Sequence, residues 1–360
     1  MGTESMTNRP RQDPMRGRGT SDNPANRFEG REYETDPEAA GAQAMPATQF
    51  IPDASRSVIS RNDSPDVPFS ASVNPYRGCE HGCVYCYARP THEYLGYSAG
   101  LDFETRILVK EDAPELLRQA LMHKRWTPQT LAMSGVTDPY QPVEKEREIT
   151  RKCLEVLAEF RNPVGIVTKN RLVTRDIDCL TELNQFNAVS VYISVTSLDP
   201  QLARILEPRT SLPRQRLETI AALRQADIPV GVLVAPIIPG LTDHETAGVI
   251  EAAAEAGAQY AGYVMLRLPH GVKGLFEDWL RAHMPDRASK VLNRIRAMRG
   301  GELNETAFGQ RMRGSGPYAQ QIQAMFDVAC RRAGIGGQAP ALSTKHFRRP
   351  GMGEQLSLFE

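Results

Sequence analysis

Three cysteines lie within eight residues of this sequence, in the run CEHGCVYC that contains Cys79, Cys83 and Cys86. Three thiolates held this close together on one loop can bind three irons of a cubane iron–sulfur cluster. The fourth iron then lacks a cysteine and is open to a substrate. A structural zinc site normally completes its tetrahedron with a fourth Cys or His, and the nearest histidines, His81 and His92, give no recognised zinc spacing. We therefore expect an iron–sulfur cluster with one open iron, with a zinc site and three unligated thiols as the alternatives.

The rest of the composition limits the class of protein. The other cysteines are dispersed, and Cys153 and Cys330 fall in apolar stripes of helical spacing, so we expect these thiols and Cys179 to be small buried groups rather than disulfide partners. Lys+Arg and Asp+Glu number 43 each, so net charge favours neither nucleic acid nor a membrane, although a local basic groove is compatible with this balance. No run approaches the roughly 18 apolar residues of a membrane span, and the first residues lack an apolar signal core. We expect a cytoplasmic protein.

About six strand-like runs alternate with helical patterns between residues 70 and 269. Near-continuous Val, Ile and Leu runs are typical of a parallel sheet covered by helices. Right-handed crossovers then give either an open doubly wound sheet or a barrel, and a complete eightfold barrel would need two more units. The expected strands are 70–77, 130–136, 164–170, 188–197, 229–241 and 260–269, and the expected helices are 113–126, 144–161, 176–186, 214–227 and 243–257.

The pattern also divides the chain into four parts. Residues 1–65 are rich in Pro, Gly, Arg, Asn, Asp and Ser with little hydrophobic periodicity, which predicts a disordered or loosely packed arm, with order beginning near Phe69. Residues 66–300 form the expected core, and residues 301–345 a helical C-terminal extension. Residues 346–360 are expected to be a flexible tail.

The cysteine run, with an aromatic residue before its third cysteine, resembles the radical S-adenosylmethionine superfamily. Together with the stretches FETRILVKEDAPELLRQAL and EPRTSLPRQRLETIAALRQADIPVGVLVAPIIPGLTD, it is similar to the spore photoproduct lyase-like branch over residues 68–300. This resemblance implies a partial (βα)6 TIM-like barrel, a [4Fe–4S] cluster and S-adenosyl-L-methionine as cofactors, and an electron donor such as flavodoxin or ferredoxin. In the family, the methionine amino and carboxylate groups chelate the open iron, and reductive cleavage yields a 5′-deoxyadenosyl radical.

The resemblance also implies a set of cofactor-binding residues. Tyr85 occupies the aromatic position beside the adenine, and Ile238 belongs to the strand-end segment that packs against it. Ser134 ends the second strand, where the family places contacts to the methionine. Lys169 matches a strand-end lysine near the methionine carboxylate, and Ser194 a serine that contacts the cofactor. The alternative for Lys169 is a surface lysine at the point where the chain leaves its strand. The alternative for Ser194 is a strand hydroxyl that is hydrogen-bonded to the backbone.

Two features near these residues are less specific. Glu207 and Arg209 are expected to be either a polar pair near the active site or a solvated turn. Spore photoproduct lyase carries a hydrogen-donor cysteine just after its second strand, but the corresponding stretch here, LAMSGVTDPYQP, has none. Tyr140 is the alternative hydrogen donor in this stretch, and lesion reversal by the cysteine route is not expected.

The chain ends in QLSLFE after a Gly-rich stretch. Gln355, Leu356, Leu358 and Phe359 resemble the short peptide with which bacterial polymerases and repair factors bind the replicative sliding clamp. In such peptides the glutamine bonds the rim of the site while the apolar side chains fill a pocket. The alternative is a tail that folds back on its own domain.

The sequence therefore predicts a radical enzyme that acts on DNA, at a lesion or a modified base, and is recruited by the sliding clamp. A lyase-like role in DNA repair follows from the branch. The same chemistry on RNA, a peptide or a small molecule is the alternative within this class. A non-catalytic, clamp-associated iron–sulfur scaffold is the alternative from another class.

Overall fold

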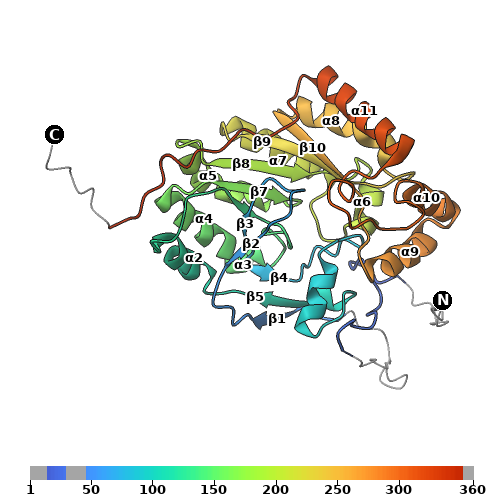
Figure 1. Ribbon diagram of the computed structural model, residues 1–360, viewed down its shortest axis with the longest axis horizontal. Helices are drawn as coiled ribbons and strands as arrows, with labels where there is room; N and C mark the ends of the chain where they lie inside the picture. Colours follow the sequence, from blue (N-terminus) through green and yellow to red (C-terminus); the bar gives the residue numbers. More distant parts are fainter. Residues whose placement is uncertain (1–13, 30–45, 352–360) are drawn as a thin grey trace.

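A computed structural model describes residues 14–29 and 46–351 of the chain, with a seven-stranded sheet at the centre (Figure 1). The strands of this sheet are β2 (Ile59–Arg61), β3 (Ala71–Val73), β6 (Leu131–Met133), β7 (Val164–Thr168), β8 (Val189–Ser194), β9 (Val230–Ile237) and β10 (Tyr260–Met265). Their order is β10-β9-β8-β7-β6-β3-β2. All neighbours from β3 to β10 are parallel, and only β2 runs antiparallel to its partner β3.

The six parallel strands follow one another in chain order, and a helix lies in every crossover between them. This arrangement confirms the predicted α/β fold with a partial (βα)6 core. The strands read as near-continuous apolar runs because the sheet is covered, and β8 and β9 are buried along most of their length. The crossover helices are α2 (Ala113–Met122), α4 (Ile149–Phe160), α5 (Ile177–Asn184), α6 (Pro200–Leu206), α7 (Pro213–Gln225) and α8 (Thr246–Glu255), with the short segments α3 (Glu144–Arg147), η2 (Arg171–Asp176) and η3 (Asp243–Glu245).

A second, three-stranded sheet supports the cysteine run. In it, β5 (Arg106–Val109) lies between β1 (Gln49–Pro52), which is parallel to it, and β4 (Tyr76–Arg77), which is antiparallel. The cysteines follow β4 directly. The chain then passes through η1 (Arg89–Leu95) and α1 (Asp102–Thr105) before it returns as β5, so both ends of the cysteine loop are tied to one sheet.

The described N-terminal residues are packed, which differs from the loose arm expected before residue 69. Strand β1 pairs with β5 and β2 pairs with β3. Arg18 and Thr20 are buried, and the arginine Nη1 donates a hydrogen bond to the Glu104 carbonyl oxygen at 2.9 Å. Polar and backbone contacts give this segment its order, and such contacts leave no hydrophobic period in the sequence.

The single helix expected over 144–161 is broken at Glu148, whose φ is 54°. The cause is the buried Glu144 side chain. It accepts a hydrogen bond from the Thr150 backbone N–H at 2.9 Å and forms an ion pair with Arg175 at 2.7 Å. The carboxylate thus satisfies a free N–H at the start of α4. An inward-facing Glu within a charged run looks like a solvated helix position, which explains the error.

Three helices follow the sheet: α9 (Val272–His283), α10 (Pro285–Ala297) and α11 (Gly316–Ala333). Figure 1 shows α11 alongside α8, and the two helices are in contact. Residues 334–351 contain no helix and run back over the core, where the Arg348 backbone N–H donates to the Phe160 carbonyl oxygen at 3.0 Å. The extension is therefore less helical than expected, and the first part of the expected tail is packed. Among the described residues, no helix is long and apolar enough to cross a membrane.

Candidate functional site

The three cysteines of the run are free thiols gathered on one loop. Cys79 belongs to a small apolar cluster with Phe103, Cys83 belongs to the cluster that contains Tyr85, and Cys86 packs against both clusters. Cys79 and Cys83 are buried, whereas Cys86 is partly exposed. Burial raises the pKa of all three thiols in the metal-free chain. In the described part of the chain, no three His, Cys, Asp or Glu side chains converge on a single ion.

Three thiols without a fourth ligand in the described ranges suit a cluster better than a single zinc ion. A tetrahedral zinc site needs ligand atoms about 2.0–2.3 Å from one point, whereas a cubane distributes its thiolates over separate irons. Two glycines allow the loop to turn tightly around the cysteines: Gly78 and Gly82 have φ values of 81° and 67°, which favour glycine. The Cys79 backbone N–H donates to the Phe103 carbonyl oxygen at 2.8 Å, and the Cys86 N–H to that of Cys83 at 3.2 Å.

Among the described residues, neither nearby histidine groups with the thiols as a fourth zinc ligand. The buried ring of His81 lies between Asp138, 3.4 Å from Nδ1, and Asn170, 3.3 Å from Nε2. The buried ring of His92 is 2.9 Å from the Arg106 carbonyl oxygen through Nε2. Burial lowers the pKa of His92 to about 4, so its ring is neutral.

Asp138 ends the turn after β6 and joins two strand ends. Its carboxylate accepts hydrogen bonds from Thr168 Oγ1 at 2.7 Å and from the Lys169 backbone N–H at 2.8 Å. Burial acts to raise the pKa of this carboxyl, but His81 and these donors outweigh it and hold the pKa below its usual value. Asp138 is therefore a charged junction that fixes the start of the segment carrying Lys169.

Tyr85 directs its hydroxyl into a buried polar set. The hydroxyl donates to the Glu207 carboxylate and lies 3.4 Å from Thr196 Oγ1. The Lys169 ammonium is 5.9 Å from the centroid of the tyrosine ring. The ring itself belongs to an apolar cluster that includes Cys83 and Ile238. One tyrosine thus joins the cysteine loop to the strand ends.

Lys169 is firmly held at the end of β7. Its ammonium donates to Ser194 Oγ at 2.9 Å, Thr196 Oγ1 at 3.0 Å and the Ala235 carbonyl oxygen at 2.9 Å. It also lies 3.0 Å from Glu207 Oε1, and its side chain is 15% exposed. The ends of β7, β8 and β9 therefore meet around one partly accessible cation, as parallel strand ends do at the mouth of such a fold.

Arg216 completes this set from the side of α7. Its guanidinium pairs with the Glu207 carboxylate and donates through Nη1 to the Ser194 carbonyl oxygen at 2.9 Å. Burial acts to raise the pKa of Glu207, but Arg216 and Lys169 outweigh it and keep the carboxyl ionised. The group carries two cations and one anion; we call it the Glu207 network, comprising Tyr85, Lys169, Ser194, Thr196, Glu207 and Arg216.

The other predicted cofactor residues lie at the same end of the sheet. Ile238 is fully buried in the apolar cluster that contains Tyr85. Ser134 has a φ of 126°, and the carbonyl oxygen of the next residue, Gly135, accepts a hydrogen bond from the Tyr87 hydroxyl at 2.7 Å. The turn after β6 therefore touches the residue that follows Cys86.

Tyr140 does not belong to this group. It is fully buried within the main core cluster, separate from the clusters that contain the cysteines. Burial and the Asp176 carboxylate raise the pKa of its hydroxyl. Such a position gives no support to its role as a hydrogen donor.

Glu207 and Arg209 are neither a pair nor a solvated turn. Glu207 is 2% exposed and lies at the centre of its network, while Arg209 pairs with Glu80 at 3.2 Å. Sequence reasoning gave Glu207 little weight and missed Thr196 and Arg216 altogether. The available signal was the position of Thr196 just beyond β8, on the same side of the strand as Ser194.

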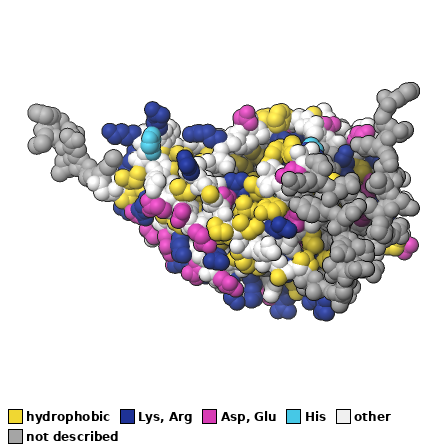
Figure 2. Space-filling view, turned by 90° about the horizontal axis from the view of Figure 1, so that it is seen from below, with side chains coloured by type: hydrophobic (Ala, Val, Ile, Leu, Met, Phe, Trp, Pro, Cys, Tyr) yellow, Lys and Arg dark blue, Asp and Glu magenta, His cyan; other side chains and the backbone are white. Residues whose placement is uncertain are grey.

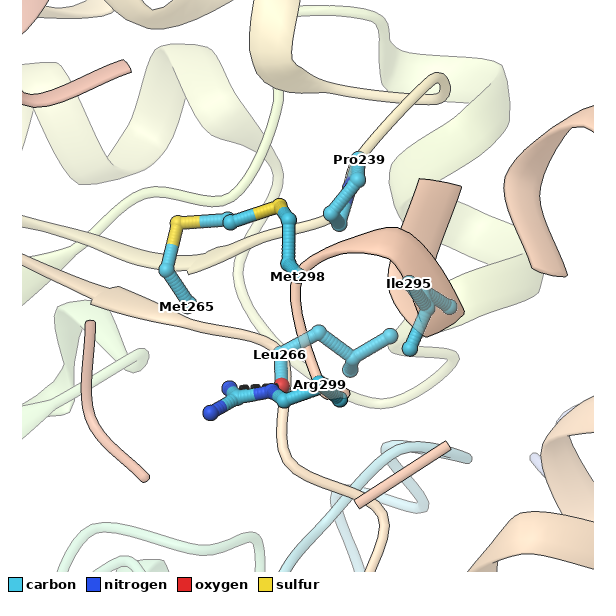
Figure 3. Close-up of a pocket in the computed structure, with 6 residues that line it drawn as sticks. All are labelled: Pro239, Met265, Leu266, Ile295, Met298 and Arg299. Carbon is cyan, nitrogen blue, oxygen red and sulfur yellow. Dashed lines mark hydrogen bonds between the residues drawn. The ribbon is translucent and has the colours of Figure 1, made fainter. Parts of the chain in front are cut away.

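A small apolar hollow lies near the ends of β9 and β10 (Figure 3). It is too narrow for a water molecule, and it is lined by Pro239, Met265, Leu266, Ile295, Met298 and Arg299. Arg299 donates through Nη2 to the Leu266 carbonyl oxygen at 2.7 Å. The hollow is a packing gap rather than a place for a cofactor.

A partial (βα)6 core with three free thiols on the loop after its first parallel strand defines a class of cluster-dependent enzymes. The family model described as "Radical SAM superfamily" matches residues 73–253, and the chain belongs to this superfamily. The family uses a [4Fe–4S] cluster and S-adenosylmethionine as cofactors, and three free thiols on one loop are the donor set that such a cluster takes.

Several relatives share parts of the sequence. An uncharacterized protein of Mycobacterium tuberculosis is 38% identical over 229 residues, which cover 62% of this chain and 66% of that protein. An uncharacterized protein of Methanocaldococcus jannaschii is 30% identical over 173 residues, covering 48% and 62% of the two chains. A radical SAM Nalpha-GlyT isomerase of Pseudomonas phage M6 is 27% identical over 181 residues, covering 49% and 35%.

Among solved structures, the fold is similar to that of spore photoproduct lyase. The lyase complexed with dinucleoside spore photoproduct has a TM-score of 0.59 and 16% identity, with 80% of each chain covered. A double mutant of the lyase with bound AdoMet and dinucleoside spore photoproduct has a TM-score of 0.57 over the same shares. At this identity the similarity establishes the fold alone.

Proposed function

We propose that this chain is a radical SAM enzyme that acts on DNA, with Cys79, Cys83 and Cys86 as the cluster ligands. When bound, the cluster supplies an electron that cleaves S-adenosylmethionine to methionine and a 5′-deoxyadenosyl radical, which takes a hydrogen atom from the substrate. The electron comes from a donor protein such as flavodoxin or ferredoxin. The chain's own residues bind and orient the two reactants.

The Glu207 network is suited to hold S-adenosylmethionine. Tyr85 presents an aromatic ring beside Cys83, and Ile238 supplies apolar surface in the same cluster. Lys169 and Arg216 outnumber the single Glu207 carboxylate, so the network carries a net positive charge that favours the methionine carboxylate. Ser194 and the turn at Ser134 offer polar groups at neighbouring strand ends.

The observation that carries the choice of DNA is the pairing of Tyr87 with Arg267. Tyr87 directly follows Cys86 and is 46% exposed. The Arg267 guanidinium lies 5.1 Å from the centroid of its ring, and within the described residues it has no carboxylate at ion-pair distance. An aromatic face beside an unneutralised guanidinium is suited to a base and its phosphate.

Other exposed aromatic side chains lie beside arginines that are themselves paired with carboxylates, Arg311 with Asp66 and Arg27 with Glu93. Phe308 is 58% exposed, with the Arg311 guanidinium 4.6 Å from its ring centroid. Phe28 stacks on Tyr94 at 4.8 Å, and both rings are exposed. Figure 2 shows hydrophobic side chains gathered over the middle of one face, with Lys and Arg side chains among them. Exposed aromatic rings of this kind support the proposed contact with nucleic-acid bases, and Arg267 supplies the cation that is unpaired among the described residues.

The comparisons add support by analogy. A structure with the same fold holds a dinucleoside spore photoproduct. The tail residues Gln355, Leu356, Leu358 and Phe359 lie outside the described residues, and their resemblance to clamp-binding peptides supplies a route to DNA. We propose that this tail recruits the enzyme to the sliding clamp and that the reaction belongs to DNA repair or base modification.

Binding of a fluorescent single-stranded oligonucleotide to the reconstituted protein tests the choice of DNA. Arg267→Gln removes the cation beside Tyr87, and we expect about tenfold weaker binding, as for loss of a charge-assisted hydrogen bond. Arg214→Gln is the matched control because the Arg214 side chain is 90% exposed and pairs only within its own helix. Equal affinity for all three proteins, or a clear preference for a peptide or RNA over DNA, would reject the DNA assignment.

A further inference from the structure

The described segment 14–29 lies against the outer side of the cysteine loop. It is far from the loop in sequence, yet Gly19 and Thr20 are buried against it. Glycine is required at the contact: a Cβ on Gly19 would lie 1.6 Å from the Gly82 carbonyl oxygen and 3.1 Å from the Val84 backbone nitrogen. Gly82 and Val84 flank Cys83, so the segment covers the backbone on both sides of one proposed cluster ligand.

One carboxylate joins this segment to the loop. Glu104 accepts hydrogen bonds from the Gly19 N–H at 3.0 Å and from the Thr20 N–H and Oγ1 at 3.1 Å each. The same carboxylate pairs with Arg89 at 2.6 Å, with both side chains fully buried. Arg89 Nε in turn donates to the Cys83 carbonyl oxygen at 3.0 Å. A continuous chain of charge-assisted hydrogen bonds therefore runs from the N-terminal segment to Cys83.

Further contacts fix the segment along its length. The Asn23 side-chain amide donates a hydrogen bond to the Asp102 carboxylate at 3.1 Å, and the Asp102 backbone N–H donates one to Asn23 Oδ1 at 2.8 Å. Asn26 donates to the Glu93 carbonyl oxygen at 2.9 Å, and Arg27 pairs with the Glu93 carboxylate at 2.7 Å. These partners belong to η1 and α1, the elements that follow the cysteines. The segment thus spans the whole return path of the loop.

We infer that residues 17–27 form a clasp that holds the cysteine loop in its cluster-binding shape and restricts access to the cluster from the outer side. Gly19 and Thr20 act as positioning residues through Glu104 and Arg89. The inference rests on the proposed ligands Cys79, Cys83 and Cys86. All the contacts that support this inference lie between residues of the chain itself.

The clasp predicts that its disruption speeds the loss of iron without unfolding the protein. Gly19→Ala places a methyl group against the Gly82 carbonyl, so the clasp must lift from the loop. Thr20→Val removes the hydroxyl that bonds Glu104 at nearly constant volume, and Thr20→Ser retains it. Gly274→Ala is the control for an added methyl group, because nothing lies within 4 Å of a Cβ there.

The experiment uses the full chain reconstituted anaerobically with iron and sulfide. We measure iron per chain, the rate of iron release to a chelator, and the thermal unfolding midpoint. Gly19→Ala and Thr20→Val are expected to release iron about tenfold faster than the wild type, as for loss of a buried charge-assisted hydrogen bond. Thr20→Ser and Gly274→Ala should release it at the wild-type rate.

Wild-type release rates for both Gly19→Ala and Thr20→Val would overturn the clasp. Should Gly19→Ala fail to fold, Thr20→Val and Thr20→Ser decide the matter between them, since equal rates for this pair also overturn it. The clasp is also rejected if a lower thermal unfolding midpoint accounts for all of the faster iron release and Thr20→Ser releases iron as fast as Thr20→Val. A wild-type chain that binds no iron would instead reject the ligand assignment, so the two failures are distinguishable.

Discussion

Glu207 is a carboxylate that holds two cations beside the cysteine loop. Its side chain is 1% exposed, lies 3.0 Å from Lys169 Nζ and pairs with Arg216. Glu207→Gln retains the size of the side chain and an oxygen that can accept a hydrogen bond from Tyr85. It removes the negative charge and leaves two cations, the buried Arg216 and the partly exposed Lys169, without their shared counter-charge.

The structure sets the expected magnitude. Removal of one partner from a buried ion pair costs about 3–5 kcal/mol, because the remaining charge loses its compensation. Lys169 keeps three other hydrogen-bond acceptors, and Arg216 keeps two carbonyl oxygens. We therefore expect the free energy of unfolding of the metal-free protein to fall by about 3 kcal/mol, the lower end of this range.

Urea unfolding followed by circular dichroism measures this difference. Glu218→Gln is the matched control, because Glu218 pairs with Arg214 at 2.8 Å while its side chain is 57% exposed; a change within about 0.5 kcal/mol is expected there. Since the cations hold the pKa of Glu207 below its ordinary value of 4.5, its stabilisation is present above that pH and is lost as pH falls. The gap between wild type and Glu207→Gln should narrow on acidification.

Equal stability of Glu207→Gln and the wild type at neutral pH would refute this reasoning. It would show that Lys169 and Arg216 need no counter-charge, and the electrostatic description of the network would fail. A gap that widens on acidification would equally contradict the assigned direction of the Glu207 pKa.

Three further predictions concern other parts of the chain. Cys83→Ala should bind only background iron after reconstitution, whereas Cys330→Ala, at a buried thiol far along the chain, should bind the wild-type amount; equal iron in both variants would reject the ligand set. Burial lowers the pKa of His92 from 6.5 to about 4, so between these two pH values the unfolded chain binds a proton at this residue and the folded chain does not. The metal-free protein should therefore lose up to about 3 kcal/mol of stability as the pH falls from 6.5 to 4. His92→Gln should flatten that dependence, and an unchanged pH profile would contradict it. Deletion of residues 355–360 should abolish retention of the protein by immobilised sliding clamp, and retention of the truncated chain would end the recruitment proposal.

Much of the fold was predictable because the core strands and helices follow simple hydrophobic periods. The apolar runs at 188–197 and 229–241 contain β8 and β9, and the parallel order follows from the alternation with helices. The carboxyl ends of parallel strands lie at the same edge of a sheet. Once the strands of Lys169 and Ser194 are assigned, the two side chains are therefore expected to lie close together. The cysteine loop was identified by spacing alone.

Other features depend on contacts between residues far apart in sequence. Glu207 lies in a turn without periodicity, and its role arises from Tyr85 and Arg216 brought to it by folding. The N-terminal segment owes its order to Glu104, some 85 residues away. Contacts of a buried carboxylate leave no mark on hydrophobic periodicity, which explains why the role of Glu207 was left open and the packed N-terminal segment was missed.

The formation of 5′-deoxyadenosine tests the central claim most directly. The wild-type chain is reconstituted anaerobically, reduced by one electron per cluster and incubated with S-adenosylmethionine, and the products are separated by chromatography. We predict methionine and 5′-deoxyadenosine in equal amounts, with neither formed by Cys83→Ala. A wild-type chain that carries a complete, reduced [4Fe–4S] cluster and forms no 5′-deoxyadenosine, alone or with DNA, would contradict the account.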